Sequence, residues 1–249
     1  MSHRFEYLLR LGDDALILGQ QLGFWTGHGP VLEEDIALTN IGLDQIGQSR
    51  AWLSMAGKEE GQGRDEDRLA FHRDQHEFRN ALLTERPNGH FGDTIARQFL
   101  FDAYAVPLHD ALSRSRDPEI AAIAKKCAKE SAYHLKHSRG WMVRLGDGTE
   151  ESHGKIQQSL NGLLPYVGDL FVSDASSQTA QEEGWGVDFA TLRPQWESNL
   201  ESALTESGLE RPKATPEQLG GRMGRHTEQL SFLLAEMQVL PRTHPEAKW

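Results

Sequence analysis

The sequence has 249 residues, a hydrophobic content of 38% and a formal net charge of −11. This length allows one large helical domain or two smaller ones, and the negative charge argues against a nucleic-acid-binding surface, which needs clustered Lys and Arg. No apolar run is long enough to span a membrane, the start MSHRFEYLLR lacks the apolar stretch of a signal peptide, and the single Cys127 permits no internal disulfide, so we expect a cytoplasmic protein.

Two helical patterns come first in the chain. Apolar residues recur at helical spacing from 5 to 25, and a second pattern runs from about 31 to 55 after the turn GHGP (27–30). A polar, Gly-containing stretch from 57 to 67 follows, and we expect it to project into solvent. These patterns predict a helical hairpin.

Asp14 and Asp44 are the two notable acids of this hairpin. Asp14 precedes the middle of the turn by about fifteen residues and Asp44 follows it by about fifteen, so a rise of about 1.5 Å per residue predicts that they lie at the same height. The helical neighbours of Asp14 are apolar, which is typical of a buried face; they are Leu11, Ile17 and Leu18.

A third helix is predicted from about 68 to 84 and contains the sequence HRDQHEF. His72 and His76 stand four residues apart and could bind a metal from one helix face. An exposed histidine pair without further ligands is more often a solvated or partner-facing surface. Both interpretations of this pair stay open.

The stretch from 99 to 138 predicts a second hairpin, of two long helices that fold back at SRSRDP. Asp102 lies on a largely apolar face of the first helix, and Pro107 in the same helix predicts a kink. Counting residues from the turn places three polar groups opposite Asp102, which are Glu130, Ser131 and His134.

The rest of the chain is also predicted to be helical. A helix is expected from 149 toward 165, resuming to 171, and another from about 189 to 207. The polar stretch from 173 to 186 is predicted to be mobile, with Trp185 as a partner contact. A last helix is predicted from 216 to 240, where TPEQ resembles a capping signature.

Two hairpins with facing polar groups at mid-height are the arrangement of a di-metal carboxylate four-helix bundle. The sequence therefore predicts an all-α protein with seven or eight helices, no strand and a single domain over 1–249. The bundle core is expected at about 4–57 and 91–145, and the extra helices at about 67–84 and 149–240.

The metal ligands of such a bundle are incomplete in this sequence. One helix of each pair normally provides a Glu or Asp, and the other provides an acid followed three residues later by His. Here Asp44 is followed three residues later by Gly47, and His134 is preceded three residues earlier by Ser131. Glu130, the nearest acid, is one residue out of phase, which is about 100° around the helix. The sequence predicts the scaffold of a di-metal site without its full ligand set.

Other chemistries have weaker support. A GxSxG elbow is absent, and Cys127 lies in mid-helix without a recognisable acid–base partner. His134 alone would more often be a hydrogen-bonded core histidine than a metal ligand. His134 and His137, with Lys129 and Lys136, could also form a basic helical face.

Segments along nearly the whole chain, from 5 to 249, resemble the PaaC family, the C subunits of phenylacetyl-CoA epoxidases. These segments are LGDDALILGQ, LEEDIALTNIGLDQIGQSRAWL, RDQHEFRNALL, ERPNGHFGDTIARQFLFDAY, KESAYHLKHS, RLGDGTEES and GRHTEQLSFLLAEMQ. So many segments in the same order are far more specific than any single motif.

The resemblance implies a ferritin-like fold and a place in a bacterial multicomponent monooxygenase that converts phenylacetyl-CoA to its ring 1,2-epoxide with dioxygen. It implies that a related A subunit holds the di-iron centre, that this chain is a non-catalytic structural partner without a cofactor, and that small B, D and reductase E subunits are also present. Flavin, an iron–sulfur cluster and NADPH are implied for the reductase.

The same resemblance implies vestigial di-iron positions and no catalytic residue in this chain. These positions are Asp14, Asp44, Gly47, Asp102, Ser131 and His134, with Glu130 as a neighbour. The alternative is a di-metal oxidase or oxygenase active in its own right, in which a π-bulge near Ser131 rotates Glu130 into phase. A binding protein for the CoA ester, with no sequence feature of its own, and a homodimer of the isolated chain are also left open.

Acids at a site that has lost its metal must be neutralised. We expect His134 to neutralise Asp102, with Arg10 or Lys129 as further candidates if their stems reach inward. For the surface that meets the partner, we expect the outer face of the first two helices, flanked by HRDQHEF and the C-terminal helices.

Overall fold

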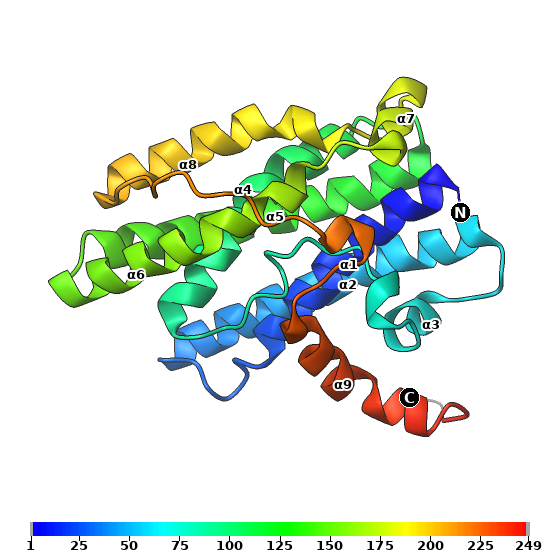
Figure 1. The fold of residues 1–249 in the computed structure, drawn as a ribbon, viewed down its shortest axis with the longest axis horizontal. Helices are drawn as coiled ribbons and strands as arrows, with labels where there is room; N and C mark the ends of the chain where they lie inside the picture. The colour runs from blue at the N-terminus through cyan, green and yellow to red at the C-terminus, as the bar shows by residue number, and fades with distance from the viewer. Residues whose placement is uncertain (1, 248–249) are drawn as a thin grey trace. The chain divides into compact units, whose positions relative to one another are not determined.

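The computed structural model describes residues 2–247, and the regular structure in this range is helical, with no strand. The chain divides into two compact units, which we call the terminal unit (1–85 and 220–249) and the central unit (86–219). Each unit contains one pair of long helices, labelled α1 and α2 or α4 and α5 in Figure 1. None of the described helices is long and apolar enough to cross a membrane. The single domain over 1–249 stays a prediction.

The long helices of the terminal unit are α1 (His3–Gly23) and α2 (Leu32–Glu60). Ser2 caps α1 by accepting a hydrogen bond from the backbone N–H of Phe5. Helix α2 has three acids in its first turn, where carboxylates interact favourably with the helix dipole. Helix α2 extends five residues beyond the predicted end at 55, so the polar connection shortens to 61–65.

Helices α1 and α2 pack closely because glycines lie where they meet. A Cβ on Gly12 would come within 2.6 Å of Leu53 Cδ2, and one on Gly19 within 2.9 Å of Ile46 Cδ1. As the residue number rises along α1 it falls along α2, so the two helices are antiparallel, as predicted (Figure 1). The absence of side chains at these positions lets the backbones approach.

The rest of the terminal unit differs from the predicted third helix. Helix α3 covers only Glu66–Phe71, and a short 3₁₀ turn follows at Gln75–Glu77. From there to the start of the next helix the chain is irregular, so the helix predicted over 68–84 is wrong. Two backbone N–H groups of this segment, those of Arg79 and Ala81, are bound instead by buried carboxylates of α1.

The central unit is built on α4 (Phe91–Leu112) and α5 (Pro118–Gly146). They fold back at the predicted turn because Asp117 caps α5, accepting hydrogen bonds from two backbone N–H groups, and Pro118 occupies the first turn. Pro107 lies inside α4, as expected. Helices α6 (Glu150–Leu163) and α8 (Arg193–Ser207) pack on this pair, and a 3₁₀ segment, Leu164–Phe171, follows α6.

The stretch predicted to be mobile, 173–186, contains helix α7 (Ala175–Glu183). Asp174 starts this helix with a capping box, which the composition of the segment concealed. Trp185 is only 7% exposed, and its indole N–H donates to Glu183 at 2.7 Å. The predictions of a mobile segment and of Trp185 as an outer contact are therefore wrong. A 3₁₀ turn at Phe189–Leu192 leads into α8.

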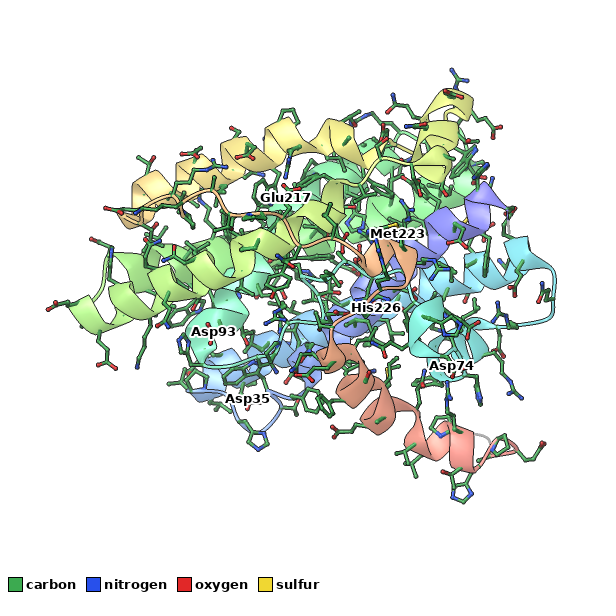
Figure 2. All side chains as sticks on the ribbon, in the orientation of Figure 1. Asp35, Asp74, Asp93, Glu217, Met223 and His226 are labelled. Carbon is green, nitrogen blue, oxygen red and sulfur yellow. The ribbon has the colours of Figure 1, made fainter. Side chains whose placement is uncertain are left out.

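The last helix starts later than predicted. Helix α9 covers Glu228–Thr243, and TPEQ lies instead in an irregular segment before the short 3₁₀ turn Gly221–Met223. Glu217 of TPEQ, labelled in Figure 2, pairs with Arg193, and the N–H of Gln218 donates to Pro165 O at 2.7 Å. TPEQ therefore makes contacts with residues distant in the sequence and does not form the predicted capping box.

Candidate functional site

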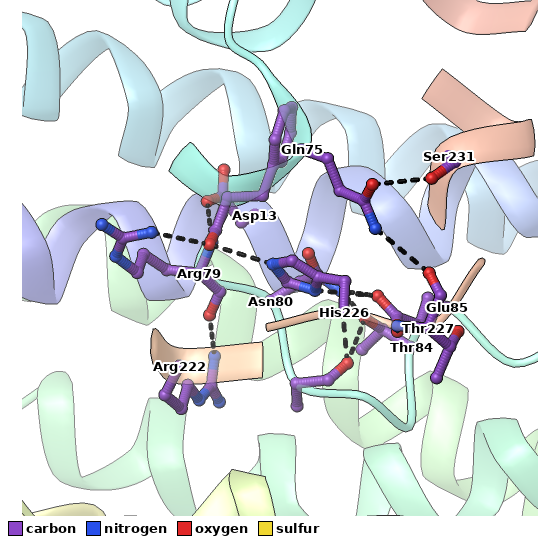
Figure 3. Close-up of polar contacts among 12 residues, drawn as sticks. Asp13, Gln75, Arg79, Asn80, Thr84, Glu85, Arg222, His226, Thr227 and Ser231 are labelled. Atoms are coloured by element: carbon purple, nitrogen blue, oxygen red, sulfur yellow. Dashed lines mark hydrogen bonds and ion pairs between the residues drawn. The ribbon is translucent and has the colours of Figure 1, made fainter. Parts of the chain in front are cut away.

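Asp14 of α1 is buried and bound by an arginine from the other end of the chain. Arg222 donates to both carboxylate oxygens, at 2.9 and 2.8 Å, and the backbone N–H of Ala81 donates to Oδ1 at 2.7 Å. Arg222 also donates to Arg79 O at 2.8 Å (Figure 3). Burial raises the pKa of Asp14, and the Arg222 charge opposes this effect. The carboxylate is thus neutralised by a cation within its own unit.

Asp13, the neighbouring acid, is also buried and has its own arginine. Arg73 binds both of its oxygens, one of them at 3.0 Å, and the backbone N–H of Arg79 donates to Oδ2 at 2.8 Å. The two acids of α1 therefore hold the segment 72–85 by its arginine and its backbone donors. Around Arg79 and Ala81 the backbone donors are thus bound by side chains of α1 and not by carbonyls of a helix.

A third buried acid, Glu85, joins the same segment to the start of α9 (Figure 3). Its carboxylate lies 3.0 Å from His226 Nδ1 and accepts hydrogen bonds from the N–H of Thr227 at 2.7 Å and from Asn80 at 3.1 Å. The other ring nitrogen of His226 lies 3.1 Å from Phe78 O. Both ring nitrogens of His226 therefore lie within hydrogen-bond distance of oxygen atoms, one from a side chain and one from the backbone.

Asp44 and Gly47 do not lie on the buried face of α2. Both are half-buried, whereas Gln45 and Gln48 are 1% and 3% exposed. These two glutamines have the spacing of an acid-x-x-His pair but carry neutral amides. The prediction from sequence followed the acid, Asp44, and so missed Gln45 and Gln48, which lie one position further along.

The packing of α1 on α2 also corrects the predicted heights. Because Gly12 meets Leu53 and Gly19 meets Ile46, Asp14 lies opposite about position 51 and not opposite Asp44. The offset is about seven residues, or roughly 10 Å along the helix. Counting from the middle of the turn fails here because residues 24–31 do not divide evenly between the two helices.

Asp102 of α4 is fully buried in the central unit and is bound by neutral groups. Ser138 Oγ donates to Oδ2 at 2.7 Å, and Gln98 Nε2 donates to Oδ1 at 2.7 Å. Burial raises the pKa of Asp102 to about 6, against the opposing charge of His134. The hydrogen bonds of Asp102 come from Gln98 and Ser138, so its neutralisation by His134 stays a prediction.

Ser131 is level with His109 rather than with Asp102. Ser131 Oγ lies 2.8 Å from His109 Nδ1, and both residues are buried. Burial, with a further contribution from His134, lowers the pKa of His109 to about 3, so this ring is neutral at pH 7. His109 follows Asp102 by seven residues, two helical turns, and that spacing was the signal that sequence reasoning overlooked.

The bulge that would rotate Glu130 into the interior is not present. Helix α5 is α-helical throughout, and Glu130 pairs with Lys126 at 3.6 Å on its flank. Lys129 and Arg10 are the further candidates for neutralising the buried acids. Lys129 is exposed and does not reach inward, whereas Arg10 is buried in α1. His72 and His76 do not share a helix face, because α3 ends at Phe71.

A di-iron centre needs about four carboxylates and two imidazoles. Among residues 2–247 no group of three or more His, Cys, Asp or Glu side chains is arranged to hold a metal ion. In the central unit, hydroxyl and amide groups surround Asp102, and in the terminal unit Arg222 occupies both oxygens of Asp14. These residues do not fit a di-iron centre. The assignment of vestigial ligands stays a prediction.

Comparisons with known proteins agree with the helical architecture. The family model described as phenylacetic acid catabolic protein matches residues 1–249. The chain is 49% identical to the C subunit of the 1,2-phenylacetyl-CoA epoxidase of Escherichia coli (strain K12), over 249 residues and the whole of both chains. A solved structure, protein 19 with aldehyde deformylating oxidase activity from Synechococcus, is 16% identical with a TM-score of 0.54, covering 84% of this chain and 94% of that one. The fold is all-α and ferritin-like, as predicted.

Proposed function

Because the chain belongs to the phenylacetic acid catabolic protein family, we propose that it is a non-catalytic structural component of a multicomponent phenylacetyl-CoA 1,2-epoxidase. A role in phenylacetate catabolism follows from the family and from the similarity to a component of that epoxidase. In this proposal the chain packs on a di-iron A subunit and holds it in a competent shape. The small B and D subunits, the reductase E subunit and the cytoplasmic location belong to the same proposal.

One observation carries the non-catalytic role. The buried acids at the candidate positions have partners that leave no place for iron, since Asp14 is held by Arg222 and Asp102 by Ser138 and Gln98. An arginine remains protonated at any physiological pH, so a cation bound to both oxygens of Asp14 would have to leave before a metal could bind. The site is thus closed by interactions within each unit.

The expected partner surface has matching features. The outer face of α2 carries large apolar side chains that are well exposed: Leu32 is 72% and Leu43 is 64% exposed, with Ile36 between them. Phe24 and Val31, just before α2, are exposed as well. Exposed apolar side chains on one helix face are typical of a permanent interface, where they are covered by a partner.

The first experiment is reconstitution. The A subunit, purified with and without this chain, is assayed for epoxidation of phenylacetyl-CoA, and the iron content of each protein is measured. We expect iron in the A subunit, little in this chain, and activity only when both are present. Undiminished activity of the A subunit alone would refute the structural role, and near-stoichiometric iron bound to this chain would support an oxidase active in its own right.

The second experiment tests the outer face of α2. We expect the pair Leu32→Glu and Leu43→Glu to abolish co-purification with the A subunit, because charges would be buried in an apolar interface. The comparison pair, Phe232→Glu and Val239→Glu, alters similarly exposed apolar residues of α9, which only flanks the expected surface, and should weaken co-purification less. Loss of binding only in the α9 pair would place the interface elsewhere and contradict the proposal.

A further inference from the structure

The outer face of α5 concentrates positive charge in an acidic protein. Between 125 and 144 the chain has six Lys or Arg and one acid, Glu130, whereas the whole chain has 26 Lys and Arg against 37 Asp and Glu. Most of these cations fall within about 100° around the helix axis, on its exposed side. We call this surface the α5 basic face; it comprises Lys125, Lys126, Lys129, Tyr133, Lys136 and Arg144.

Three lysines of the α5 basic face have no neutralising partner. Lys125, Lys129 and Lys136 are exposed, and none of them makes an ion pair or hydrogen bond with another of the described residues. Lys126 differs, because it pairs with Glu130. Like charges at i, i+4 spacing repel one another, so this face carries an electrostatic cost that a negatively charged surface would relieve.

The centre of this face is suited to contact with a protein. Tyr133 is 57% exposed and stands among the lysines. A tyrosine surrounded by polar residues is a common anchor of protein interfaces, because it buries a large area at a low cost in side-chain entropy. Gly140 lies further along the same face, and a side chain there would meet nothing within 4 Å, so the surface is open.

We propose that the α5 basic face binds an acidic face of a protein partner. The net charge of −11 disfavours an extended polyanion such as nucleic acid or an anionic membrane, which would meet the acidic remainder of the molecule. The face extends about 28 Å along the helix, which is comparable with one side of a small domain. Exposed charges favour rapid, salt-sensitive association, in contrast to the apolar face of α2.

The inference rests on the proposed function in one respect: the partner is taken to be another protein component of the epoxidase. The test variant is Lys125→Glu, Lys129→Glu and Lys136→Glu in the full-length chain. The control, Arg114→Glu, Lys155→Glu and Lys213→Glu, makes the same change in net charge at exposed positions of the same unit. Unchanged helix content and unfolding midpoint establish that both variants are folded.

Each of the other epoxidase components, purified and fluorescently labelled, is titrated with the wild-type chain and with both variants at low and high salt. We expect one acidic component to bind the wild-type chain, with affinity reduced at least tenfold by the test variant and by high salt, and less than twofold by the control. A Lys→Gln version of the three substitutions should give an intermediate loss.

Equal binding by the test and control variants, for every component, would overturn the proposal. Weaker binding of phenylacetyl-CoA, with all protein affinities unchanged, would also overturn it, since the lysines would then serve the phosphates of the ligand. These results differ from failure of the proposed function, which would appear as activity of the A subunit without this chain.

Discussion

At the scale of single residues, the protein stabilises its buried carboxyl groups in two ways. In the terminal unit, Asp13 and Asp14 are each paired with an arginine, so charge is balanced by charge. In the central unit, Asp102 receives hydrogen bonds from a hydroxyl and an amide, and burial raises its pKa to about 6. In the first solution a positive charge compensates the carboxylate, whereas the second lets Asp102 take up a proton in mildly acidic solution.

The pairing of Arg222 with Asp14 predicts a large effect of Arg222→Met. Removing the cation leaves a buried carboxylate without compensation, and we expect the free energy of unfolding to fall by about 3–5 kcal/mol in urea denaturation at pH 7. Adding Asp14→Asn should restore much of this loss, because the uncompensated charge is removed. A loss below about 1 kcal/mol would show that the pair is not an important source of stability.

The raised pKa of Asp102 predicts a pH-dependent effect of Asp102→Asn. The folded state holds its proton up to about pH 6, whereas the unfolded chain releases it near pH 4, so ionisation destabilises the wild type as pH rises between these values. The variant lacks this penalty. Its free energy of unfolding relative to wild type should therefore rise by about 2–3 kcal/mol from pH 4 to pH 7. A pH-independent difference would show that burial does not perturb Asp102.

At the scale of elements, close backbone approach decides where helices and connections can pack. In α2, Gly57 faces the connection to α3, and a Cβ there would lie 2.1 Å from the carbonyl oxygen of Arg64. The nearest atom is part of the backbone, which moves aside less readily than the end of a flexible side chain. By contrast, Gly140 in α5 has open space around its Cα.

Substitutions at these two glycines should have opposite signs. We expect Gly57→Ala to lower the free energy of unfolding by about 1–3 kcal/mol, because the connection must shift. Gly140→Ala should raise it by roughly 0.5–1 kcal/mol, through better helix propensity. Thermal denaturation of both variants beside the wild type measures the difference. A stabilising Gly57→Ala would mean that the connection at 61–65 adapts without cost.

At the scale of the whole molecule, the structure predicts a fold that does not depend on metal. The buried acids at the candidate positions are bound by protein groups within each unit, so iron has no vacant set of ligands to complete. We expect the unfolding midpoint of the isolated chain to be the same with excess ferrous iron or with a chelator. An increase with iron, saturating at a fixed stoichiometry, would contradict this view, since ligands that bind the folded state stabilise it.

The sequence by itself determined the helical elements, both hairpins and the incomplete acid-x-x-His pattern. Periodicity, caps and turn residues act over a few neighbouring positions, so α1, α2, α4 and α5 were predictable within a few residues at most ends. The same local logic failed where distant residues supplied the partners. The segment 72–85 has a helical pattern, but carboxylates of α1 accept hydrogen bonds from two of its backbone N–H groups, those of Arg79 and Ala81.

Only the tertiary structure decided which side chains meet. The register of each hairpin depends on how its connection divides between the helices, and this moved Asp14 away from Asp44 and placed Ser131 beside His109. Arg222 lies 208 positions from Asp14 in the chain, and no local pattern links them. Pairing across such distances is set by packing of the whole unit, because burial makes an unpaired charge costly wherever its partner lies in the sequence.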